Sequence, residues 1–566
     1  MKPSGGARPD RVPAASAVAT PFGEVDAKAE QVMVPMRDGV RLATDVYLPA
    51  RTPAPVVLVR LPYDKTSTFS FMPQIGTYIC DRGYGFVAQD VRGKVRSEGD
   101  AFAFTSEVDD GADTLDWIES QRWCDGSIVM FGDSYYGFTQ WAAAASGHTA
   151  LKAIVPQVTT TEIGTDWMYH QGVFCMDTML GWASSTWMGA PVYEFPNGID
   201  WRHSPLAEII PSMFEGRPSP SLEAWRAAPP QDAFWTRDIF AGRTVHPPRI
   251  PVLHSGGWWD VFRRGQMRDW QRARGAGAPG QHLLFEHIDH YGGELTSDGE
   301  PVLNYLEDPS VVERMLPRYL DPAIEFYDYY VRGRGDMPPP VRWRLANADL
   351  RSDGVSWPPE GARPVEFFLC DAASASKGPA GGALRTTQDR LDQSTTWTHD
   401  PADPVPDLIS DVWCPLLGLP DEREVEMRPD VVTFTSEEMS APFDIAGNAS
   451  ADLFVRSSCE TTHVMAKLVD VFPNGRARRI AEGASLMRAG SGGGPVQVDL
   501  GPTGYRLASG HRLRLEVAAS DSPRYIVHPG TSEDPWTAET FKTTEQRLSV
   551  GGDRSCLRLS AIPYKT

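Results

Sequence analysis

The chain has 566 residues, of which 41% are hydrophobic and 23% are charged, and its net charge is -20. This length exceeds what one hydrophobic core normally holds, so we expect about two to four domains. The negative charge argues against a nucleic acid or an anionic membrane surface as the main partner.

The seven cysteines are scattered and form no C-x-x-C pair. This pattern argues against a disulfide scaffold or a zinc framework and suits a reducing compartment. No apolar run approaches the length of a membrane span. We therefore expect a cytoplasmic protein with no membrane segment.

The predicted elements begin after residues 1–24, which are rich in Pro, Ala and Gly and lack the apolar core of a signal peptide. We expect these residues to form a mobile tail. Residues 32–47 alternate around an R-D-G turn and predict a β-hairpin. Residues 109–120 have helical spacing with acids in the first turn. Short apolar runs typical of strands buried on both faces occupy 55–60, 83–90, 127–132, 153–158, 251–257 and 282–286. The alternation of such strands with helices predicts a parallel α/β sheet.

Two later segments have a different composition. Residues 161–246 contain many Trp, Met, Tyr and Phe but no obvious buried strand, which predicts a helical cap inserted into the sheet domain. From about residue 346, short alternating segments separated by turn residues predict an all-β sandwich or jelly roll. The expected division is an α/β domain at 25–160 and 247–345, a cap at 161–246, and a β domain at 346–566.

The segment V-M-F-G-D-S-Y-Y-G-F-T-Q-W (129–141) places Ser134 between a buried strand and a predicted helix. A serine at such a corner is typical of a nucleophile elbow, whose usual signature is G-x-S-x-G. Gly132 and Ser134 fit this signature, but the second glycine is Gly137, one position late. From the triplet alone, an ordinary turn with a surface serine is equally compatible. If the turn is an elbow, we expect the adjacent Asp133 to point elsewhere.

A nucleophilic serine needs a base, and the base needs an orienting carboxylate. On an α/β-hydrolase sheet the order along the chain is serine, acid, histidine, each after a strand. Asp260 follows the predicted strand 251–257, and His290 lies in the loop after 282–286. His287 is a competing candidate for the base, and His282 is a weaker one.

Several motifs together carry a family resemblance. They are M-R-D-G-V-R-L-A-T-D-V-Y (36–47), R-L-P-Y-D-K (60–65), Q-D-V-R-G-K-V-R-S-E-G (89–99), W-C-D-G-S-I-V-M-F-G-D-S-Y-Y-G (123–137), G-G-W-W-D (256–260), D-P-A-D-P-V-P (400–406) and A-K-L-V-D-V-F-P-N-G-R-A (466–477). With these motifs the chain resembles the bacterial cocaine esterase and X-Pro dipeptidyl-peptidase family of serine hydrolases (CocE/NonD type) from about residue 30 to the end. The resemblance is strongest to the cocaine-esterase branch, which also holds α-amino-acid ester hydrolases and cephalosporin acylases.

The resemblance implies an α/β-hydrolase body, an inserted helical cap and a C-terminal jelly roll. It also implies that Ser134 is the nucleophile, Asp260 the triad acid and His290 the base. The Tyr63 hydroxyl and the backbone N–H of Tyr135 would form the oxyanion hole. The serine motif of the family is G-x-S-Y-x-G, which explains the late glycine. The family usually carries G-P-W-x-H-G at the histidine, where this chain has E-H-I-D-H-Y-G.

The expected function is hydrolysis of a small-molecule ester with an apolar or aromatic acyl group, through an acyl-enzyme and with no metal or organic cofactor. Trp167, Trp259 and Phe262 are candidate walls of the acyl pocket, although core packing explains them nearly as well. Branches that prefer a free α-amine use clustered carboxylates, for which Asp166 and Asp177 are candidates.

Several alternatives stay open at this point. They are an amide-cleaving acylase, an X-Pro dipeptidyl-peptidase or α-amino-acid ester hydrolase, a biosynthetic acyltransferase, and a non-catalytic binding protein. The jelly roll could also support self-association into a homo-oligomer.

Overall fold

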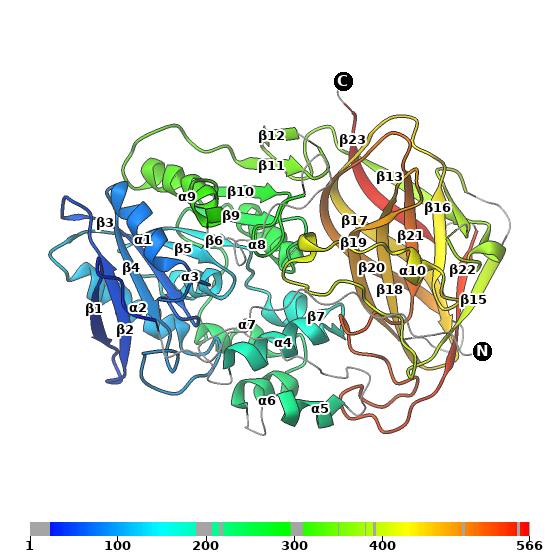
Figure 1. The fold of residues 1–566 in the computed structure, drawn as a ribbon, viewed down its shortest axis with the longest axis horizontal. Helices are drawn as coiled ribbons and strands as arrows, with labels where there is room; N and C mark the ends of the chain where they lie inside the picture. Colours follow the sequence, from blue (N-terminus) through cyan, green and yellow to red (C-terminus); the bar gives the residue numbers. More distant parts are fainter. Residues whose placement is uncertain are drawn as a thin grey trace.

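The computed structural model describes residues 23–187, 206–213, 219–295, 310–348, 350–379, 381–388, 392–488, 493–551 and 555–564. Figure 1 shows an α/β body beside a C-terminal β domain, with a group of helices between them. Apart from its last two residues, the tail expected at 1–24 lies outside the described residues. No helix in the described ranges is long and apolar enough to cross a membrane.

The body is built on a ten-stranded sheet with the order β1-β2-β4-β3-β5-β6-β9-β10-β11-β12. Its strands are β1 (Glu30–Pro35), β2 (Arg41–Tyr47), β3 (Ala54–Leu61), β4 (Gly85–Asp90), β5 (Cys124–Asp133), β6 (Leu151–Gln157), β9 (Val252–Gly257), β10 (Gln281–Glu286), β11 (Val341–Leu345) and β12 (Leu350–Gly354). In this order the strands from β4 to β11 run parallel, whereas β1, β2 and β12 pair antiparallel. The predicted hairpin and parallel sheet are confirmed. Because β12 belongs to this sheet, the sheet extends beyond the boundary expected at 345.

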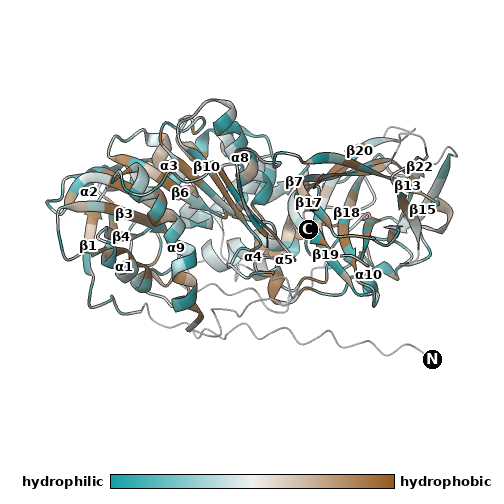
Figure 2. Cartoon of the chain, turned by 90° about the horizontal axis from the view of Figure 1, so that it is seen from above, coloured by the Kyte–Doolittle hydropathy of each residue, from teal (hydrophilic) through white to brown (hydrophobic). Residues whose placement is uncertain are grey.

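The sheet is covered on both faces, which explains the continuous apolar runs of its strands. Val56 and Leu58 of β3 face one core cluster, whereas Val57 and Val59 face another. The helices are α1 (Met72–Asp81), α2 (Glu107–Glu119), α3 (Ser134–Ser146), α8 (Arg263–Gly275) and α9 (Ser310–Tyr330). Figure 2 shows α3 and α8 on one side of the sheet and α1 and α9 on the other.

The predicted insertion lies between β6 and β9. Its described elements are η1 (Ile163–Met168), β7 (Tyr169–His170), β8 (Val173–Phe174), α4 (Met176–Trp187), α5 (Leu206–Met213), α6 (Pro220–Ala227), α7 (Ala233–Thr236) and η2 (Asp238–Phe240). The segment is largely helical, as expected, but it also contains the two-residue strands β7 and β8, which are too short to give a periodic pattern. Its aromatic side chains share one core cluster with α2 and α3.

The C-terminal domain is an eleven-stranded sheet with the order β15-β22-β17-β23-β13-β14-β16-β21-β18-β19, and β20 also pairs with β17. Its strands are β13 (Arg363–Cys370), β14 (Gly382–Arg385), β15 (Gln393–His399), β16 (Val432–Ser436), β17 (Phe443–Ser457), β18 (Thr461–Val471), β19 (Ala477–Arg488), β20 (Gly494–Leu507), β21 (Arg512–Ala518), β22 (Thr544–Val550) and β23 (Cys556–Ile562). Its short helices are η3 (Ala372–Ser374), η4 (Pro415–Leu417) and α10 (Arg423–Glu426). The predicted all-β domain is confirmed.

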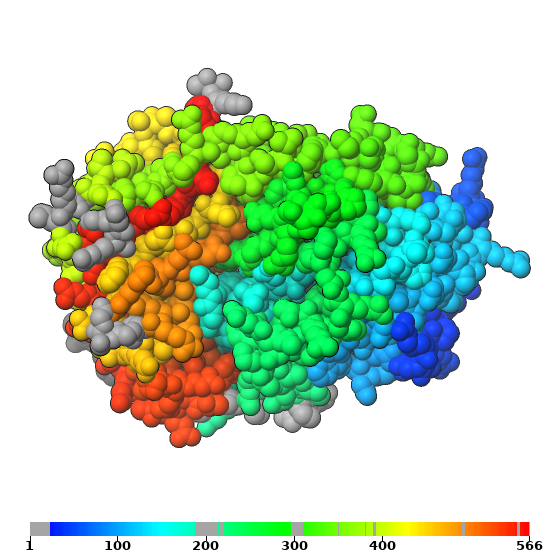
Figure 3. Space-filling view, turned by 180° about the vertical axis from the view of Figure 1, so that it is seen from behind, coloured from blue at the N-terminus to red at the C-terminus, as the bar shows by residue number. Residues whose placement is uncertain are grey.

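The inserted cap is joined to the C-terminal domain by backbone hydrogen bonds. The N–H of Met176 donates to the carbonyl of Arg524 at 3.0 Å, and the N–H of Ile526 donates to the carbonyl of Phe174 at 3.0 Å. Figure 3 shows the two surfaces in contact, with the cyan and green cap against the orange strands. The start of α4 is therefore held by the β domain, although the rest of the helix lies over the body.

Candidate active site

Ser134 occupies a strained corner between a strand and a helix. Strand β5 ends at Asp133 and α3 begins at Ser134, whose φ is 53°. The backbone of Gly132 has φ 137°, and a Cβ there would lie 2.1 Å from Cδ2 of Tyr136. A non-glycine residue with positive φ is costly and persists only where its surroundings enforce it. The structure therefore has the sharp turn expected of a nucleophile elbow.

The displaced glycine of the motif has a packing reason. A Cβ on Gly137 would lie 2.5 Å from Cγ2 of Thr159 and 3.1 Å from the carbonyl oxygen of Gln157. Thr159 in turn donates its hydroxyl proton to the carbonyl of Ser134 at 2.7 Å. Helix α3 thus lies against the segment that follows β6, and only glycine allows this approach.

His290 and Asp260 are brought together as the sequence predicts. Nδ1 of His290 lies 2.7 Å from Oδ1 of Asp260. The backbone N–H of Phe262 donates to the other carboxylate oxygen at 3.1 Å, and Asp260 is fully buried. A carboxylate at Nδ1 favours the tautomer that carries its proton there, which leaves Nε2 as the basic nitrogen.

The loop that departs from the family pattern is fixed by Asp289. Oδ1 of Asp289 accepts from the N–H of Gly293 at 2.8 Å and from the N–H of Tyr291 at 3.2 Å, and Oδ2 accepts from the N–H of Leu416 at 3.2 Å. Burial raises the pKa of Asp289 to about 8, although these N–H donors oppose the shift. Asp289 therefore ties the loop of His290 to the C-terminal domain.

The competing histidines have other partners. Nε2 of His287 lies 3.2 Å from Oε1 of Glu294, which also pairs with Arg318. His282 contacts the Tyr330 hydroxyl through Nε2 at 2.7 Å. Of the three candidates, His290 is the one paired with Asp260.

Tyr63 follows β3 and lies beside the serine. Nε1 of Trp182 donates to the Tyr63 hydroxyl at 3.1 Å, and that hydroxyl is also hydrogen-bonded to Ser134. Burial raises the pKa of Tyr63 to about 12, although both hydrogen bonds lower it. The hydroxyl therefore keeps its proton at neutral pH and is able to donate it.

Tyr135, directly after the serine, is anchored by its own side chain. Its hydroxyl donates to Oε1 of Glu107 at 2.8 Å and accepts from the N–H of Phe104 at 2.9 Å. Glu107 forms a buried ion pair with Arg60 at 2.8 Å. This network holds Tyr135, the second residue of α3, directly after the serine at the corner.

A cavity of about 80 Å³ connects these groups. Ser134, His290 and Tyr63 all line it. Half of its remaining lining residues are aromatic, namely Phe69, Phe71, Tyr136, Trp182, Tyr291, Tyr319 and Trp413. The arrangement suits an apolar ligand held beside a nucleophile and a base.

The three expected pocket walls lie elsewhere, because none of them is among the described residues lining this cavity. The Trp167 ring packs 4.9 Å from that of Trp182, and the Phe262 ring packs 5.6 Å from that of His290. Trp167 and Phe262 therefore pack against residues that line the cavity and do not line it themselves. Trp259 lines a separate cavity against the C-terminal domain. For Trp167 and Phe262, core packing, the other interpretation of these residues, is what the structure shows.

Trp413 is a site residue that sequence reasoning missed. Its ring centroid lies 4.7 Å from that of His290, and it lines the cavity from the C-terminal domain. It comes from an irregular segment with no motif, so only the tertiary fold places it here. Trp182 was recognised as an aromatic of the cap, but its bond to Tyr63 has no signal in the sequence either.

Asp133 also differs from expectation, because it lines the cavity rather than pointing elsewhere. The hydroxyl of Tyr319 donates to its Oδ1, and the side chain of Tyr136 also forms a hydrogen bond with it. Burial raises the pKa of Asp133 to about 7. A carboxyl group therefore lies next to the serine in the cavity wall, beside two tyrosines.

The acids expected to bind an α-amine do not line this cavity. Asp166 pairs with Arg268 at 2.7 Å. Asp177 lies 3.7 Å from Arg524. Asp166 is buried and Asp177 is partly buried, and each has a cationic partner already in place.

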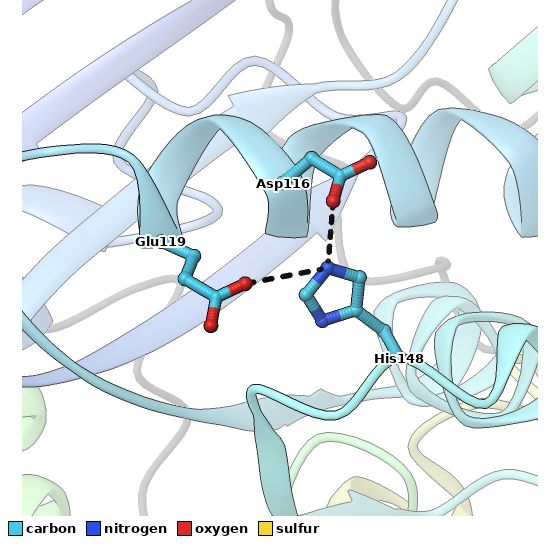
Figure 4. A group of neighbouring side chains, drawn as sticks. All are labelled: Asp116, Glu119 and His148. Atoms are coloured by element: carbon cyan, nitrogen blue, oxygen red, sulfur yellow. Dashed lines mark hydrogen bonds and ion pairs between the residues drawn. The ribbon is translucent and has the colours of Figure 1, made fainter.

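A surface cluster of Asp116, Glu119 and His148 has ligand atoms close enough for a metal ion (Figure 4). Nδ1 of His148 accepts from the N–H of Ala150 at 3.2 Å, and Nε2 lies 3.0 Å from Oδ1 of Asp116. Because Nδ1 accepts this hydrogen bond, the ring proton is on Nε2, which donates a hydrogen bond to Asp116. His148 thus has no free lone pair for a metal, and a hydrogen-bonded surface cluster is the simpler description.

Comparison with known proteins gives consistent matches. A family model described as X-Pro dipeptidyl-peptidase (S15 family) matches residues 38–292, and a model of the X-Pro dipeptidyl-peptidase C-terminal non-catalytic domain matches residues 334–556. The chain is 32% identical over 555 residues to a cocaine esterase from Rhodococcus sp. (strain MB1 Bresler), covering 89% of this chain and 92% of that protein.

Two solved structures share the fold along nearly the whole chain. An α-amino acid ester hydrolase matches with a TM-score of 0.78 and 23% identity, covering 97% of this chain and 100% of that one. An aminopeptidase from the marine sediment archaeon Thaumarchaeota archaeon matches with a TM-score of 0.77 and 20% identity, covering 100% of both chains. At sequence identities of 20% and 23%, these similarities show a shared fold and nothing about activity.

Proposed function

Because the chain belongs to the cocaine esterase and X-Pro dipeptidyl-peptidase family of serine hydrolases, we propose that it cleaves a small-molecule ester through an acyl-enzyme formed on Ser134. In this proposal His290 is the general base, Asp260 orients it, and the Tyr63 hydroxyl and the Tyr135 N–H form the oxyanion hole. The observation that carries the proposal is a single aromatic cavity lined by Ser134, His290 and Tyr63, with Asp260 bonded to Nδ1 of the histidine.

The proposed first step forms the acyl-enzyme. Nε2 of His290 accepts the hydroxyl proton as Oγ of Ser134 bonds to the acyl carbon. Asp260 stabilises the resulting imidazolium. The negative charge on the former carbonyl oxygen is met by the two oxyanion donors. When this intermediate collapses, the bond to the leaving group breaks and His290 passes its proton to that group.

The second step releases the acid by the same groups. Water enters, Nε2 of His290 takes a proton from it, and the water oxygen bonds to the acyl carbon. Collapse then breaks the bond to Oγ of Ser134, which recovers its proton from His290. Every proton therefore moves through one histidine.

The aromatic wall supports a small apolar or aromatic acyl group. Amide cleavage by an acylase or an X-Pro dipeptidyl-peptidase is the alternative, and it uses the same two steps with an amine as the leaving group. Hydrolysis of an α-amino-acid ester is a further alternative, in which the leaving group is an alcohol. One family model that matches the chain describes X-Pro dipeptidyl-peptidases, so amides belong in the first test.

The test is hydrolysis of a panel of p-nitrophenyl esters and of aminoacyl and X-Pro p-nitroanilides. We expect the wild type to cleave an ester, and Ser134→Ala and His290→Ala to lose at least about 10³-fold in kcat. His287→Ala is the matched control and should keep most of its activity. An active His290→Ala variant with an inactive His287→Ala variant would reverse the assignment of the base. Cleavage of p-nitroanilides alone would select the peptidase.

A further inference from the structure

A second cavity, of about 20 Å³, borders the loop that carries Asp260. Trp259 and Val261, on either side of Asp260 in the sequence, line it from the body, and Pro415 lines it from the C-terminal domain. No residue of the proposed triad is among the described residues of its wall. A volume above about 10–15 Å³ holds one particle of the size of a water molecule. The cavity is therefore separate from the proposed reaction site and has room for one small ligand.

Helix α8 brings two arginines to this junction, where Figure 1 shows it beside the β domain. Arg263 and Arg264 open the helix, and Arg524 reaches the same place from the C-terminal domain. Oε1 of Glu482 lies 3.7 Å from Arg263 and 3.8 Å from Arg524. The other nearby acid is Asp177, 3.7 Å from Arg524. Arg264 forms no ion pair with a described residue, and its Nη2 donates to backbone carbonyls. Three cations thus face two acids.

The surplus of positive charge lies on the side of α8. Arg479, another arginine of the wall, lies 2.7 Å from both Asp407 and Glu422. Burial raises the pKa of Glu482, but the three arginines near α8 lower it to about 2. Burial also lowers the pKa of His170 well below its usual value, and the same arginines lower it further. Both Glu482 and His170 therefore lie in surroundings with excess positive charge.

Two side chains that line the cavity have an N–H group without an acceptor. Nε of Arg263 and Nε1 of Trp259 form no hydrogen bond with any described residue. Arg263 is 3% exposed and Trp259 is 8% exposed, so bulk water does not satisfy these donors. A buried donor without a partner is costly, and a charged one more so. The wall therefore calls for an acceptor placed inside the cavity.

Charge decides which acceptor suits the site. A water molecule would accept these hydrogen bonds but leave the extra positive charge of the arginines uncompensated. Buried charges are stable in proteins when an opposite charge is close and hydrogen-bonded. Hydrogen bonds from a guanidinium group to an anion are roughly twice as strong as those between neutral groups. A monatomic anion supplies both the acceptor and the charge, and the small volume excludes large anions.

We propose that this cavity binds one small monovalent anion of about the size of chloride, held by the indole N–H of Trp259 and the guanidinium group of Arg263. Nη1 of Arg263 also donates to the carbonyl of Asp260 at 3.3 Å. The anion therefore joins the loop of Asp260 to the C-terminal domain. This site does not depend on the reaction at Ser134, so failure of the proposed function would leave it standing.

The first test is thermal unfolding at constant ionic strength, with potassium chloride replacing potassium gluconate. Gluconate is too large for a cavity of about 20 Å³. A ligand that binds only the folded protein raises its melting temperature. Between 1 and 100 mM chloride, the melting temperature of the wild type should rise by about 2 °C or more. No rise in the wild type would overturn the site.

The variants separate the site from a general effect of salt. Arg263→Met should abolish the rise. Trp259→Phe keeps the ring but removes the N–H, and should raise the half-maximal chloride concentration at least about fivefold. Trp270→Phe is the matched control, because the Nε1 of Trp270 is also buried without a described partner but Trp270 does not line the cavity. If Arg263→Met does not fold, Trp259→Phe decides. A rise in Trp259→Phe identical to that in Trp270→Phe would overturn the assignment.

The second test locates the anion directly. Crystals of the wild type grown in potassium bromide should give an anomalous difference peak in the cavity, within hydrogen-bonding reach of Trp259 and Arg263. The peak should be absent in Arg263→Met and present in Trp270→Phe. A wild-type cavity that holds a water molecule, with no anomalous peak, would overturn the anion site.

Discussion

The Tyr63 hydroxyl illustrates how single residues prepare the site. Its oxygen accepts from the indole N–H of Trp182, so the lone pair on that side is occupied. The proton of the phenol then lies away from the indole, and both Tyr63 and Ser134 line the cavity. This explains how a neutral tyrosine could serve as a preoriented oxyanion donor.

Removing this hydroxyl gives the first prediction. Tyr63→Phe should lower kcat about 10²–10³-fold with a small change in KM, because the donor acts mainly in the transition state. Steady-state kinetics on the best ester of the panel measures this. Tyr78→Phe is the control. The hydroxyl of Tyr78, on α1, donates to Asp321 of α9, and neither residue is among those lining the cavity. A kcat within threefold of the wild type would exclude Tyr63 from the oxyanion hole.

At this scale the sequence predicted residues that sit in motifs and missed those placed by tertiary contacts. The order of Ser134, Asp260 and His290 after three parallel strands was readable because such strands bring their carboxyl ends to one edge of the sheet. The position of Asp260, whose Oδ1 lies 2.7 Å from Nδ1 of His290, favours His290 over His287 as the proposed base. Trp413 and the orientation of Asp133 carried no local signal, because each depends on packing against another element.

At the scale of elements, the corner between β5 and α3 depends on close backbone approach. Gly132 supplies a conformation that other residues rarely adopt, and Gly137 lets α3 reach the segment after β6. Gly257 allows a similar close approach between the loop that carries Asp260 and the one that carries His290, since a Cβ there would lie 2.3 Å from the carbonyl oxygen of Ile288. The turns that hold Ser134, Asp260 and His290 are thus fixed against one another by glycines.

The second prediction concerns Gly137. In Gly137→Ala the added methyl group would meet Thr159 and the backbone of Gln157, so α3 must shift. We expect a loss of about 1–3 kcal/mol in unfolding free energy and at least tenfold in kcat/KM. Urea unfolding and ester hydrolysis measure the two effects.

Gly275→Ala is the matched control for Gly137→Ala. A Cβ at Gly275, the last residue of α8, has no neighbour within 4 Å. Its stability and activity should therefore stay near those of the wild type. If Gly137→Ala behaves like this control, the close approach of α3 does not matter for the corner.

The elements themselves were largely predictable. Strands buried on both faces left continuous apolar runs, and the change to short alternating segments marked the β domain. The sequence did not predict strands whose residues form no clear alternating or apolar pattern. Strands β7 and β8 have two residues each, and β12 shows only partly buried and exposed side chains, although it pairs with β11 in the body.

At the scale of the whole molecule, the β domain takes part in the site. It supplies Trp413 to the cavity and the N–H of Leu416 to the loop of His290. It also holds the start of α4, the helix that carries Trp182. The body alone therefore does not complete the cavity.

The third prediction tests this dependence through Arg524. This buried arginine donates to the hydroxyl of Thr178 and lies 3.7 Å from Asp177, both at the start of α4. Burial raises the pKa of Asp177 to about 7, and Arg524 is the first group that opposes this. Arg524→Met leaves the acid unpaired, which should cost about 3–5 kcal/mol of stability and lower kcat/KM.

Arg385→Met is the control for Arg524→Met. Arg385 forms an exposed ion pair with Asp371 at 2.5 Å on the same domain. Such a pair contributes less than about 1 kcal/mol. Urea unfolding and ester hydrolysis are measured for both variants, and only Arg524→Met should lose stability and kcat/KM. Equal losses in the two variants would show that the contact between the cap and the C-terminal domain is unimportant.

The central claim is that Ser134 is the nucleophile activated by His290 and Asp260. The most direct measurement is intact-protein and peptide mass spectrometry after reaction with a fluorophosphonate, which phosphonylates an activated serine with loss of fluoride. We expect one adduct, on the peptide that carries Ser134. It should be absent in Ser134→Ala, and its formation should be strongly slowed in His290→Ala but not in His287→Ala. An adduct on another serine, or none on the folded wild type, would contradict the central claim.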